Sequence, residues 1–181
     1  MPERPIVRLG DSRLWTASAA VREPSHDAVQ RTIVDLDDTL ARFRTDTGWG
    51  RGISAVQIGD LQRITYVRLV PDDWKGNPGI PANRQREAAL QTFVFLNPQI
   101  VSRSDETFDL WDDCFSFPNL MVRVKRHYRI AVRYQDQSGA ARELDAEGDL
   151  SELLQHEFDH LDGILAIDRR IDDRSFRLAG A

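Results

Sequence analysis

The sequence predicts an α+β fold in which the strands pair mostly antiparallel. Three observations predict it: a long amphipathic stretch near the start, several strand-like stretches in the middle, and a second helical stretch near the end. The chain has 181 residues, which fits a single domain (1–181) with a core of its own.

The first helix is expected in "EPSHDAVQRTIVDLDDTLARFRTDTG". Ser25 follows a proline and is the expected N-cap, and Gly48 and Gly50 end the stretch. The apolar residues recur at steps of three and four, which places them on one face of a helix. They are Val29, Ile33, Leu36, Leu40 and Phe43.

Strands are expected next. "RITYVRLV" and "QTFVFLNPQIV" each read as one strand, and the segment between them, 71–90, is rich in Pro, Gly and charge. That segment is expected to be a surface loop with a short helical turn near Arg86 to Leu90. "YRIAVRYQDQSGAARELDAEG" alternates and turns at Ser138 and Gly139, which predicts a hairpin.

The last helix is expected in "DLSELLQHEFDHLDG", with Gly163 as its stop. Asp149 and Glu152 are three residues apart, as in a capping box with Asp149 as the N-cap. Four apolar positions predict that one side of this helix is buried. They are Leu153, Leu154, Phe158 and Leu161.

Composition excludes several classes of protein. The net charge of -5 and the pI near 5.4 argue against nucleic-acid binding, which needs a basic face. No apolar run is long enough to span a membrane, and no secretory signal is expected at the start. Cys114 is the single cysteine, so no intramolecular disulfide is expected, and a reducing compartment is favoured.

The last helix carries the chemistry. His156 and His160 are four residues apart, so on a helix they lie on one face and can bind one metal ion. Glu157 is offset by about 100° from His156, which suits a general base beside the metal rather than a third ligand. The alternative, a solvated helix with a chance HExxH, is disfavoured by the helical signals around the motif.

A catalytic site of this kind needs a third protein ligand and one open position. No histidine follows Gly163, and the other two, His26 and His127, are expected on the surface and at a strand edge. The remaining soft ligand is Cys114, in "LWDDCFSFP".

Three motifs in order resemble those of the peptide deformylases. The family motifs are GxGxAAxQ, EGCLS and QHExDHLxG; this chain has "GRGISAVQIG", "DDCFSFP" and "QHEFDHLDG". The resemblance implies antiparallel sheets packed around a C-terminal HExxH helix. It also implies a metal-dependent hydrolase that removes the formyl group from N-formylmethionyl peptides in the cytoplasm, with the ribosome as a further partner.

The resemblance also implies roles for individual residues. Cys114, His156 and His160 would hold one divalent ion, usually Fe²⁺, with Zn²⁺, Ni²⁺ or Co²⁺ able to replace it. Glu157 would be the acid and base, and Gln57 and the backbone N–H of Phe115 would form the oxyanion hole. The substrate would lie extended against an edge formed by Gly50, Gly52 and Ile53.

The chain departs from the family pattern at charged positions. Asp112 and Asp113 replace the glutamate and glycine of the second motif, and Asp113 adds a negative charge beside the cleft. Asp149 and Glu152 stand where apolar residues usually border the methionine pocket. Either both acids face water and cap the helix, or the pocket accepts a polar or cationic group. Three arginines are candidates to neutralise them: Arg123, Arg126 and Arg129.

Four functions follow from these observations. The first is the deformylase of N-formylmethionyl peptides. The second is an amidase for another polar or cationic N-formyl or N-acyl compound, such as a small N-formyl amine of a specialised pathway. The third is an inactive binder of peptide N-termini, disfavoured because every residue needed for chemistry is present. The fourth, a general zinc protease, is disfavoured by the upstream cysteine.

Overall fold

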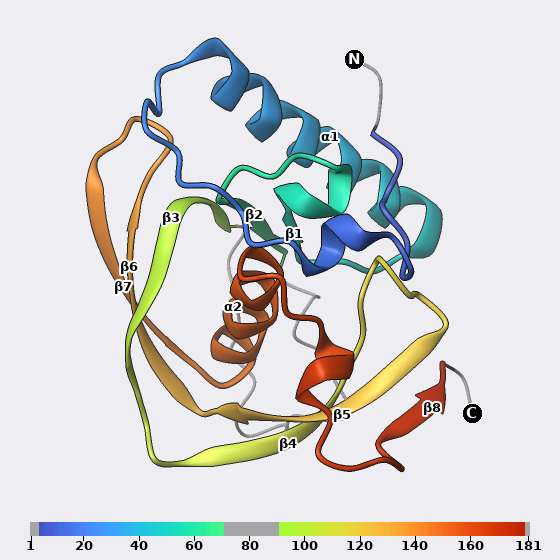
Figure 1. Cartoon of the computed structure of the whole chain (residues 1–181). Helices are drawn as coiled ribbons and strands as arrows, with labels where there is room; N and C mark the ends of the chain where they lie inside the picture. The colour runs from blue at the N-terminus through green and yellow to red at the C-terminus, as the bar shows by residue number, and fades with distance from the viewer. Residues whose placement is uncertain (1–3, 71–90, 180–181) are drawn as a thin grey trace.

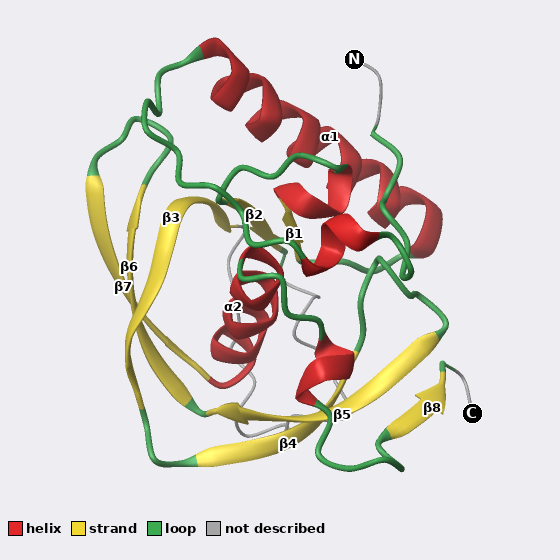
Figure 2. Cartoon of the chain, in the orientation of Figure 1, coloured by secondary structure: helices red, strands yellow, loops and turns green. Residues whose placement is uncertain are grey.

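A computed structural model describes residues 4–70 and 91–179. Two antiparallel sheets form the body of this part of the chain (Figure 1, Figure 2). The larger sheet has the strand order β1 (Gly52–Ser54), β2 (Ile64–Leu69), β3 (Gln91–Arg103), β6 (Arg129–Gln135) and β7 (Ala141–Glu147). The smaller sheet has the order β4 (Thr107–Asp112), β5 (Leu120–His127) and β8 (Phe176–Leu178).

The second helix, α2 (Gly148–Leu161), lies between the two sheets (Figure 1). It contacts β1 and β7 of the larger sheet and β5 of the smaller one. All 14 of its residues are buried, including every charged one. The expectation of one buried side is therefore wrong, because both sheets cover the helix. The predicted α+β class, with antiparallel sheets around a C-terminal helix, is confirmed.

The first helix, α1 (Asp27–Thr47), packs against β1 and β2 with its apolar stripe. The predicted N-cap was Ser25, but the cap is His26, whose Nδ1 accepts the Ala28 N–H at 3.1 Å. Gly48 ends the helix in the left-handed region (φ 78°), as predicted.

The predicted strands at 63–70 and 91–101 correspond to β2 and β3, and the predicted hairpin to β6 and β7. Gly139 has a positive φ in the hairpin turn, as the Ser-Gly pair predicted. The predicted loop at 71–90 and its helical turn lie outside the described residues. Short 3₁₀ helices connect some of these elements: η1 (Ser12–Trp15), η2 (Ala55–Ile58) and η4 (Ala166–Arg169).

The junction between β7 and α2 differs from the prediction. The N-cap is Glu147 rather than Asp149, and Gly148 starts the helix with a φ of 60°. This turn directs the first turn of the helix into the protein, so that Asp149 and Glu152 are only 1% and 2% exposed. Of the two alternatives that the sequence left open, the one in which both acids face water is therefore wrong. At the other end the helix stops at Leu161. Gly163, the predicted stop, follows two residues later with a φ of 70°.

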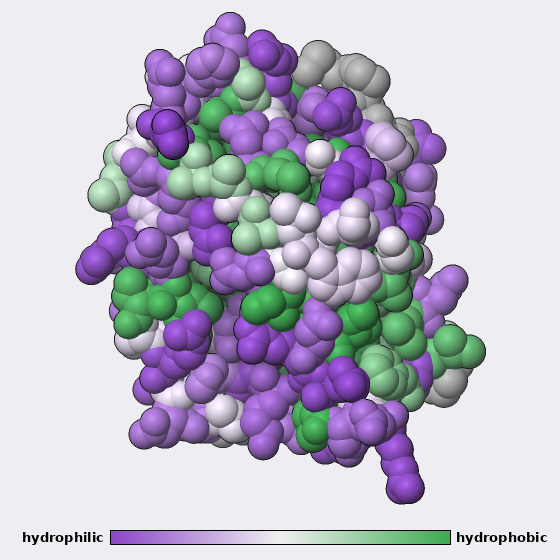
Figure 3. Space-filling view, viewed as in Figure 1, coloured by the Kyte–Doolittle hydropathy of each residue, from purple (hydrophilic) through white to green (hydrophobic). Residues whose placement is uncertain are grey.

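The surface mixes polar and apolar residues on the face shown in Figure 3. Among the described residues, the most exposed large apolar side chain is that of Leu178 in β8, at 66%, and Phe176 of the same strand is 39% exposed. Among the described residues, no helix combines the length and the apolar character needed to cross a bilayer.

Candidate active site

Three candidate ligands meet at one point. The Sγ of Cys114 and one ring nitrogen each of His156 and His160 lie within 4.8 Å of one another. Sγ is 3.3 Å from His160 Nε2, and the two imidazole centroids are 4.9 Å apart. All three side chains are buried. The cysteine comes from the loop after β4 and the histidines from successive turns of α2, so the two sheets and the helix together bring them into contact.

This donor set fits a divalent metal ion. One thiolate and two imidazoles suit Fe²⁺ or Zn²⁺. Three protein ligands leave the fourth tetrahedral position open for water or substrate, as in catalytic sites. The three ligand atoms lie within 4.8 Å of one another, close enough to be ligands of one ion.

A buried charge network orients His156. Asp112 Oδ1 lies 2.9 Å from His156 Nδ1, which directs Nε2 of that ring toward the cysteine. Arg126 binds Asp112 at 3.1 Å and Asp159 at 2.5 Å, and Arg169 binds Asp159 at 2.8 Å. Asp159, directly before His160 in the chain, thus binds two arginines. Asp162 is half exposed and binds Arg63.

The two histidines have opposite pKa shifts. Burial acts to lower the pKa of His156, but Asp112 outweighs burial, and the net shift is well upward. Burial and the neighbouring His156 lower the pKa of His160 well below its ordinary range. His160 is therefore neutral at pH 7, with a ring lone pair available to an ion.

Glu157 has the environment of a general base. It is 3% exposed, and Ser54 donates to its Oε2 at 2.7 Å. Burial raises the pKa of Glu157 to about 7, against the opposing effects of His156 and Ser54. A Cβ on Gly52 would lie 2.7 Å from Glu157 Oε1, so any larger residue here would displace this carboxylate. Ser54 was not among the predicted site residues.

Gln57 and Phe115 lie beside the cluster. The Gln57 amide Nε2 is 3.6 Å from Cys114 Sγ, and its Oε1 accepts the Ser54 N–H at 2.8 Å, which fixes the amide orientation. Phe115 follows Cys114, and its ring stacks on Phe43 with centroids 3.9 Å apart. The Phe115 ring is thus part of the core under α1, and its main chain lies next to the ligand.

The predicted substrate edge corresponds to a sheet edge. Gly52 and Ile53 are in β1, which is the terminal strand of the five-stranded sheet. Gly50 has a φ of 122°, and a Cβ there would lie 2.7 Å from the Phe115 ring. Contacts within the protein therefore already favour glycine at positions 50 and 52, whether or not a substrate backbone also comes close to them.

The remaining predicted site residues form a second charged group. Arg51 Nη2 binds Glu152 Oε1 at 2.5 Å, and the charges of Asp113 and Asp149 also act on Arg51. None of the three arginines proposed to neutralise these acids does so; each binds another acid. Arg123 binds Asp109, Arg126 binds Asp112 and Arg129 binds Glu147. The sequence did not identify Arg51, which is 101 residues from its partner Glu152.

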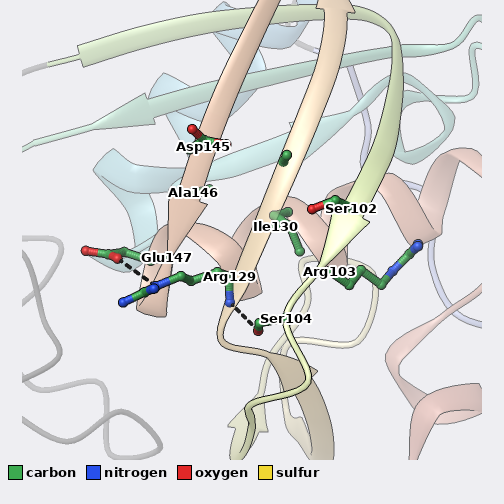
Figure 4. Close-up of a pocket in the computed structure, with 9 residues that line it drawn as sticks. Ser102, Arg103, Ser104, Arg129, Ile130, Asp145, Ala146 and Glu147 are labelled. Atoms are coloured by element: carbon green, nitrogen blue, oxygen red, sulfur yellow. Dashed lines mark hydrogen bonds and ion pairs between the residues drawn. The ribbon is translucent and has the colours of Figure 1, made fainter.

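A separate depression of about 460 Å³ lies on the larger sheet at β3, β6 and β7 (Figure 4). Arg129 crosses it to Glu147, and the Arg129 N–H donates to Ser104 Oγ at 3.0 Å. None of the predicted metal, acid-base or substrate residues lines this depression.

Comparison with known proteins gives one consistent result. A family model described as polypeptide deformylase matches residues 3–175. The peptide deformylase of Brachyspira hyodysenteriae is 34% identical, over 92% of this chain and 80% of that protein. Peptide deformylase 2 of Nostoc sp. is 36% identical, over 91% and 84%.

Solved structures agree with these sequence relatives. The peptide deformylase of Thermotoga maritima superposes with a TM-score of 0.77 at 28% identity, over 95% of this chain and all of that one. The peptide deformylase of Ehrlichia chaffeensis in complex with actinonin superposes with a TM-score of 0.78 at 30% identity, over 93% and 89%.

Proposed function

This chain belongs to the polypeptide deformylase family, and from that membership we propose that it is a metal-dependent hydrolase that removes the formyl group from N-formylmethionyl peptides. The observation that carries the proposal is the meeting of Cys114, His156 and His160 within 4.8 Å, with the carboxyl of Glu157 on the next residue of α2. These residues supply a metal site and a base at one place.

In this proposal Cys114, His156 and His160 hold one divalent ion. The ion supplies Lewis acidity for the formyl group and lowers the pKa of water. Asp112 keeps His156 in position through its Nδ1. The thiolate and the two imidazoles do not distinguish Fe²⁺ from Zn²⁺, Ni²⁺ or Co²⁺. We propose Fe²⁺ as the working ion because it is the usual one in the family that this sequence resembles.

Glu157 moves the proton. As a base it takes a proton from the water whose oxygen adds to the formyl carbon, and as an acid it delivers that proton to the amine nitrogen when the C–N bond breaks. The products are formate and a peptide with a free amine. A pKa near 7 allows the same carboxyl to act in both directions at neutral pH. Ser54 holds Oε2 while Gly52 leaves space at Oε1.

Gln57 and the Phe115 N–H stabilise the oxyanion in this mechanism. The Gln57 amide is held by the Ser54 N–H, so its Nε2 is preorganised toward the ligand cluster. Loss of one such donor costs about 3 kcal/mol in comparable sites. The peptide lies extended along β1 at Gly50, Gly52 and Ile53, in the manner of an added strand.

The wider setting is also a proposal. We propose that 1–181 is a single domain, which is supported by a family match that covers residues 3–175. The substrate is newly made peptide, so the cytoplasm and the ribosome are the proposed location and partner. Co-sedimentation of the protein with ribosomes tests the partner, and its absence from the ribosome pellet at low salt would contradict it.

The test is formate release from formyl-Met-Ala-Ser by anaerobically purified, iron-loaded protein. The replacement Glu157→Ala should retain the metal and lose turnover, because only the base is removed. Glu23→Ala, at an exposed position, is the control and should keep full turnover. Unchanged turnover in Glu157→Ala would contradict the role of Glu157.

A further inference from the structure

Four charged residues gather beside the candidate metal centre, and we call them the Arg51 cluster. They are Arg51, Asp113, Asp149 and Glu152. Three of them lie next to a residue of the site: Arg51 between two glycines at the β1 edge, Asp113 before the cysteine, and Glu152 one helical turn before His156. The cluster therefore borders the position of a substrate whose formyl group is at the metal.

The charges in this cluster do not balance. The ion pair of Arg51 with Glu152 accounts for one acid, and two acids remain. Asp149 is 1% exposed, and no side chain among the described residues binds its carboxylate; besides the charge of Arg51, only the backbone N–H groups of Asp149 and Leu150, at the start of α2, lie close enough to lower its pKa. A buried carboxylate without a partner is costly. Burial raises the pKa of Asp149 to about 7, which a nearby cation would reverse.

Asp113 gives the cluster a connection to solvent. Asp113 is exposed, 16% of the Arg51 side chain is exposed, and only 3% of the Glu152 side chain is. Exposure therefore falls from Asp113 through Arg51 to the buried acids, so a substrate group would reach these acids from the side of Asp113.

We propose that the Arg51 cluster is a substrate subsite for a cationic group, an ammonium or guanidinium on the side chain of the formylated residue. The inference rests on the formyl hydrolysis of the proposed function and changes the preferred side chain of the formylated residue from methionine to a cationic one. The Cβ atoms of residues one turn apart on a helix are about 5–6 Å from each other, so Glu152 is close to the ligand His156. The side chain of the formylated residue branches one atom from the formyl nitrogen, so it is the substrate group that reaches this distance first.

The cationic group would supply what the cluster lacks. An ammonium has three donors and no acceptor, so it can donate to carboxylate oxygens of both Asp149 and Glu152. Hydrogen bonds between ionised partners are about twice as strong as neutral ones. An apolar side chain of the same length would leave the Asp149 carboxylate unpartnered and would make no such bonds.

The test compares formyl-Lys-Ala-Ser with formyl-norleucyl-Ala-Ser, whose side chains share four carbons and differ in the ammonium. Formyl-Met-Ala-Ser and formyl-Glu-Ala-Ser complete the series. The expected result is a kcat/KM for the lysyl peptide at least about tenfold above that for the norleucyl peptide, and the lowest value for the glutamyl peptide. Equal or higher values for the norleucyl and methionyl peptides would overturn the subsite.

A pair of matched variants locates the preference. Asp149→Asn removes the unpartnered charge and keeps the ion pair of Arg51 with Glu152, so the ratio of lysyl to norleucyl kcat/KM should fall toward one. Asp105→Asn makes the same change at an exposed turn and should keep the ratio of the unchanged protein. A ratio unaffected by Asp149→Asn would overturn the assignment to this cluster.

Binding separates this inference from the proposed function. Glu157→Gln protein, titrated calorimetrically with the lysyl and norleucyl formyl peptides, reports affinity without turnover. If the unchanged protein releases no formate from any peptide but this variant binds the lysyl peptide at least about tenfold more tightly, the deformylase proposal fails and the subsite stands. Formate release without any lysyl preference in either assay leaves the deformylase and overturns the subsite.

Discussion

Replacement of Arg126 with Met tests how far the buried charge network stabilises the candidate site. Arg126 is 3% exposed and lies between two acids, Asp112 at 3.1 Å and Asp159 at 2.5 Å. Met has a similar length and no charge, so the replacement keeps much of the volume and removes the shared cation. Two buried carboxylates then lose their common partner.

The magnitude follows from burial. Removal of one partner of a buried ion pair costs about 3–5 kcal/mol, because the remaining charge is left uncompensated. Here Asp159 keeps Arg169, and Asp112 keeps His156, so the expected loss is at the low end, about 3 kcal/mol.

Arg123→Met is the matched control. Arg123 is on the same strand, β5, and binds Asp109 of the same neighbouring strand, β4, at 3.0 Å. Half of its side chain is exposed, and exposed pairs contribute only about 0–1 kcal/mol. The two variants therefore differ mainly in the burial of the pair that is lost.

The assay is urea unfolding of metal-loaded protein at pH 7.5. Burial acts to raise the pKa of Asp112, but His156 and Arg126 outweigh it, and the net shift is below the ordinary value of 3.8. The stabilisation from the pair of Asp112 and Arg126 is therefore present above about pH 4 and is lost as the pH falls further. The difference in free energy of unfolding between the unchanged protein and Arg126→Met should become smaller in that range. A loss below about 1 kcal/mol at pH 7.5, equal to that of the Arg123 control, would refute the reasoning.

Three further predictions concern single side chains. Asp149→Asn should make the protein more stable at pH 8, by roughly 2 kcal/mol, about half of the unscreened value of the shift, because the raised pKa of Asp149 gives stability that is present below pH 3.8 and lost as the pH rises through about 7; equal melting temperatures of variant and unchanged protein from pH 5 to 9 would argue against this. Ser54→Ala should lower kcat by about tenfold with unchanged metal content, since Glu157 loses a donor; an unaltered kcat and pH profile would contradict it. Gly52→Ala should lower kcat by more than Ser54→Ala does, because the added methyl displaces Glu157 Oε1, and activity equal to the unchanged protein would exclude that contact.

The sequence predicted the elements whose signals are local. The apolar stripe of α1, the glycine that ends it and the hairpin of β6 and β7 all depend on neighbouring residues, and each was found. The spacing of His156 and His160 likewise placed both rings on one face of α2. Strands β4, β5 and β8 were not predicted, since each is short or carries charges at alternating positions.

The partners of the site residues could not be predicted in the same way. Arg51 and Glu152 are 101 residues apart, and Ser54 and Glu157 are 103 apart, so no local pattern joins them. Asp149 and Glu152 matched a capping box, which local sequence cannot distinguish from two buried acids. The turn at Gly148 and the sheets around α2 decide between these alternatives.

The central claim is that one sulfur and two imidazoles hold a single ion. X-ray absorption of zinc-loaded protein measures this directly, because Cys114 is the only cysteine. We expect one ion per chain, with one sulfur at about 2.3 Å and two or more light neighbours at about 2.0–2.1 Å, and the loss of that sulfur together with most of the metal in Cys114→Ala. A spectrum without sulfur, or the same spectrum in Cys114→Ala, would contradict the claim.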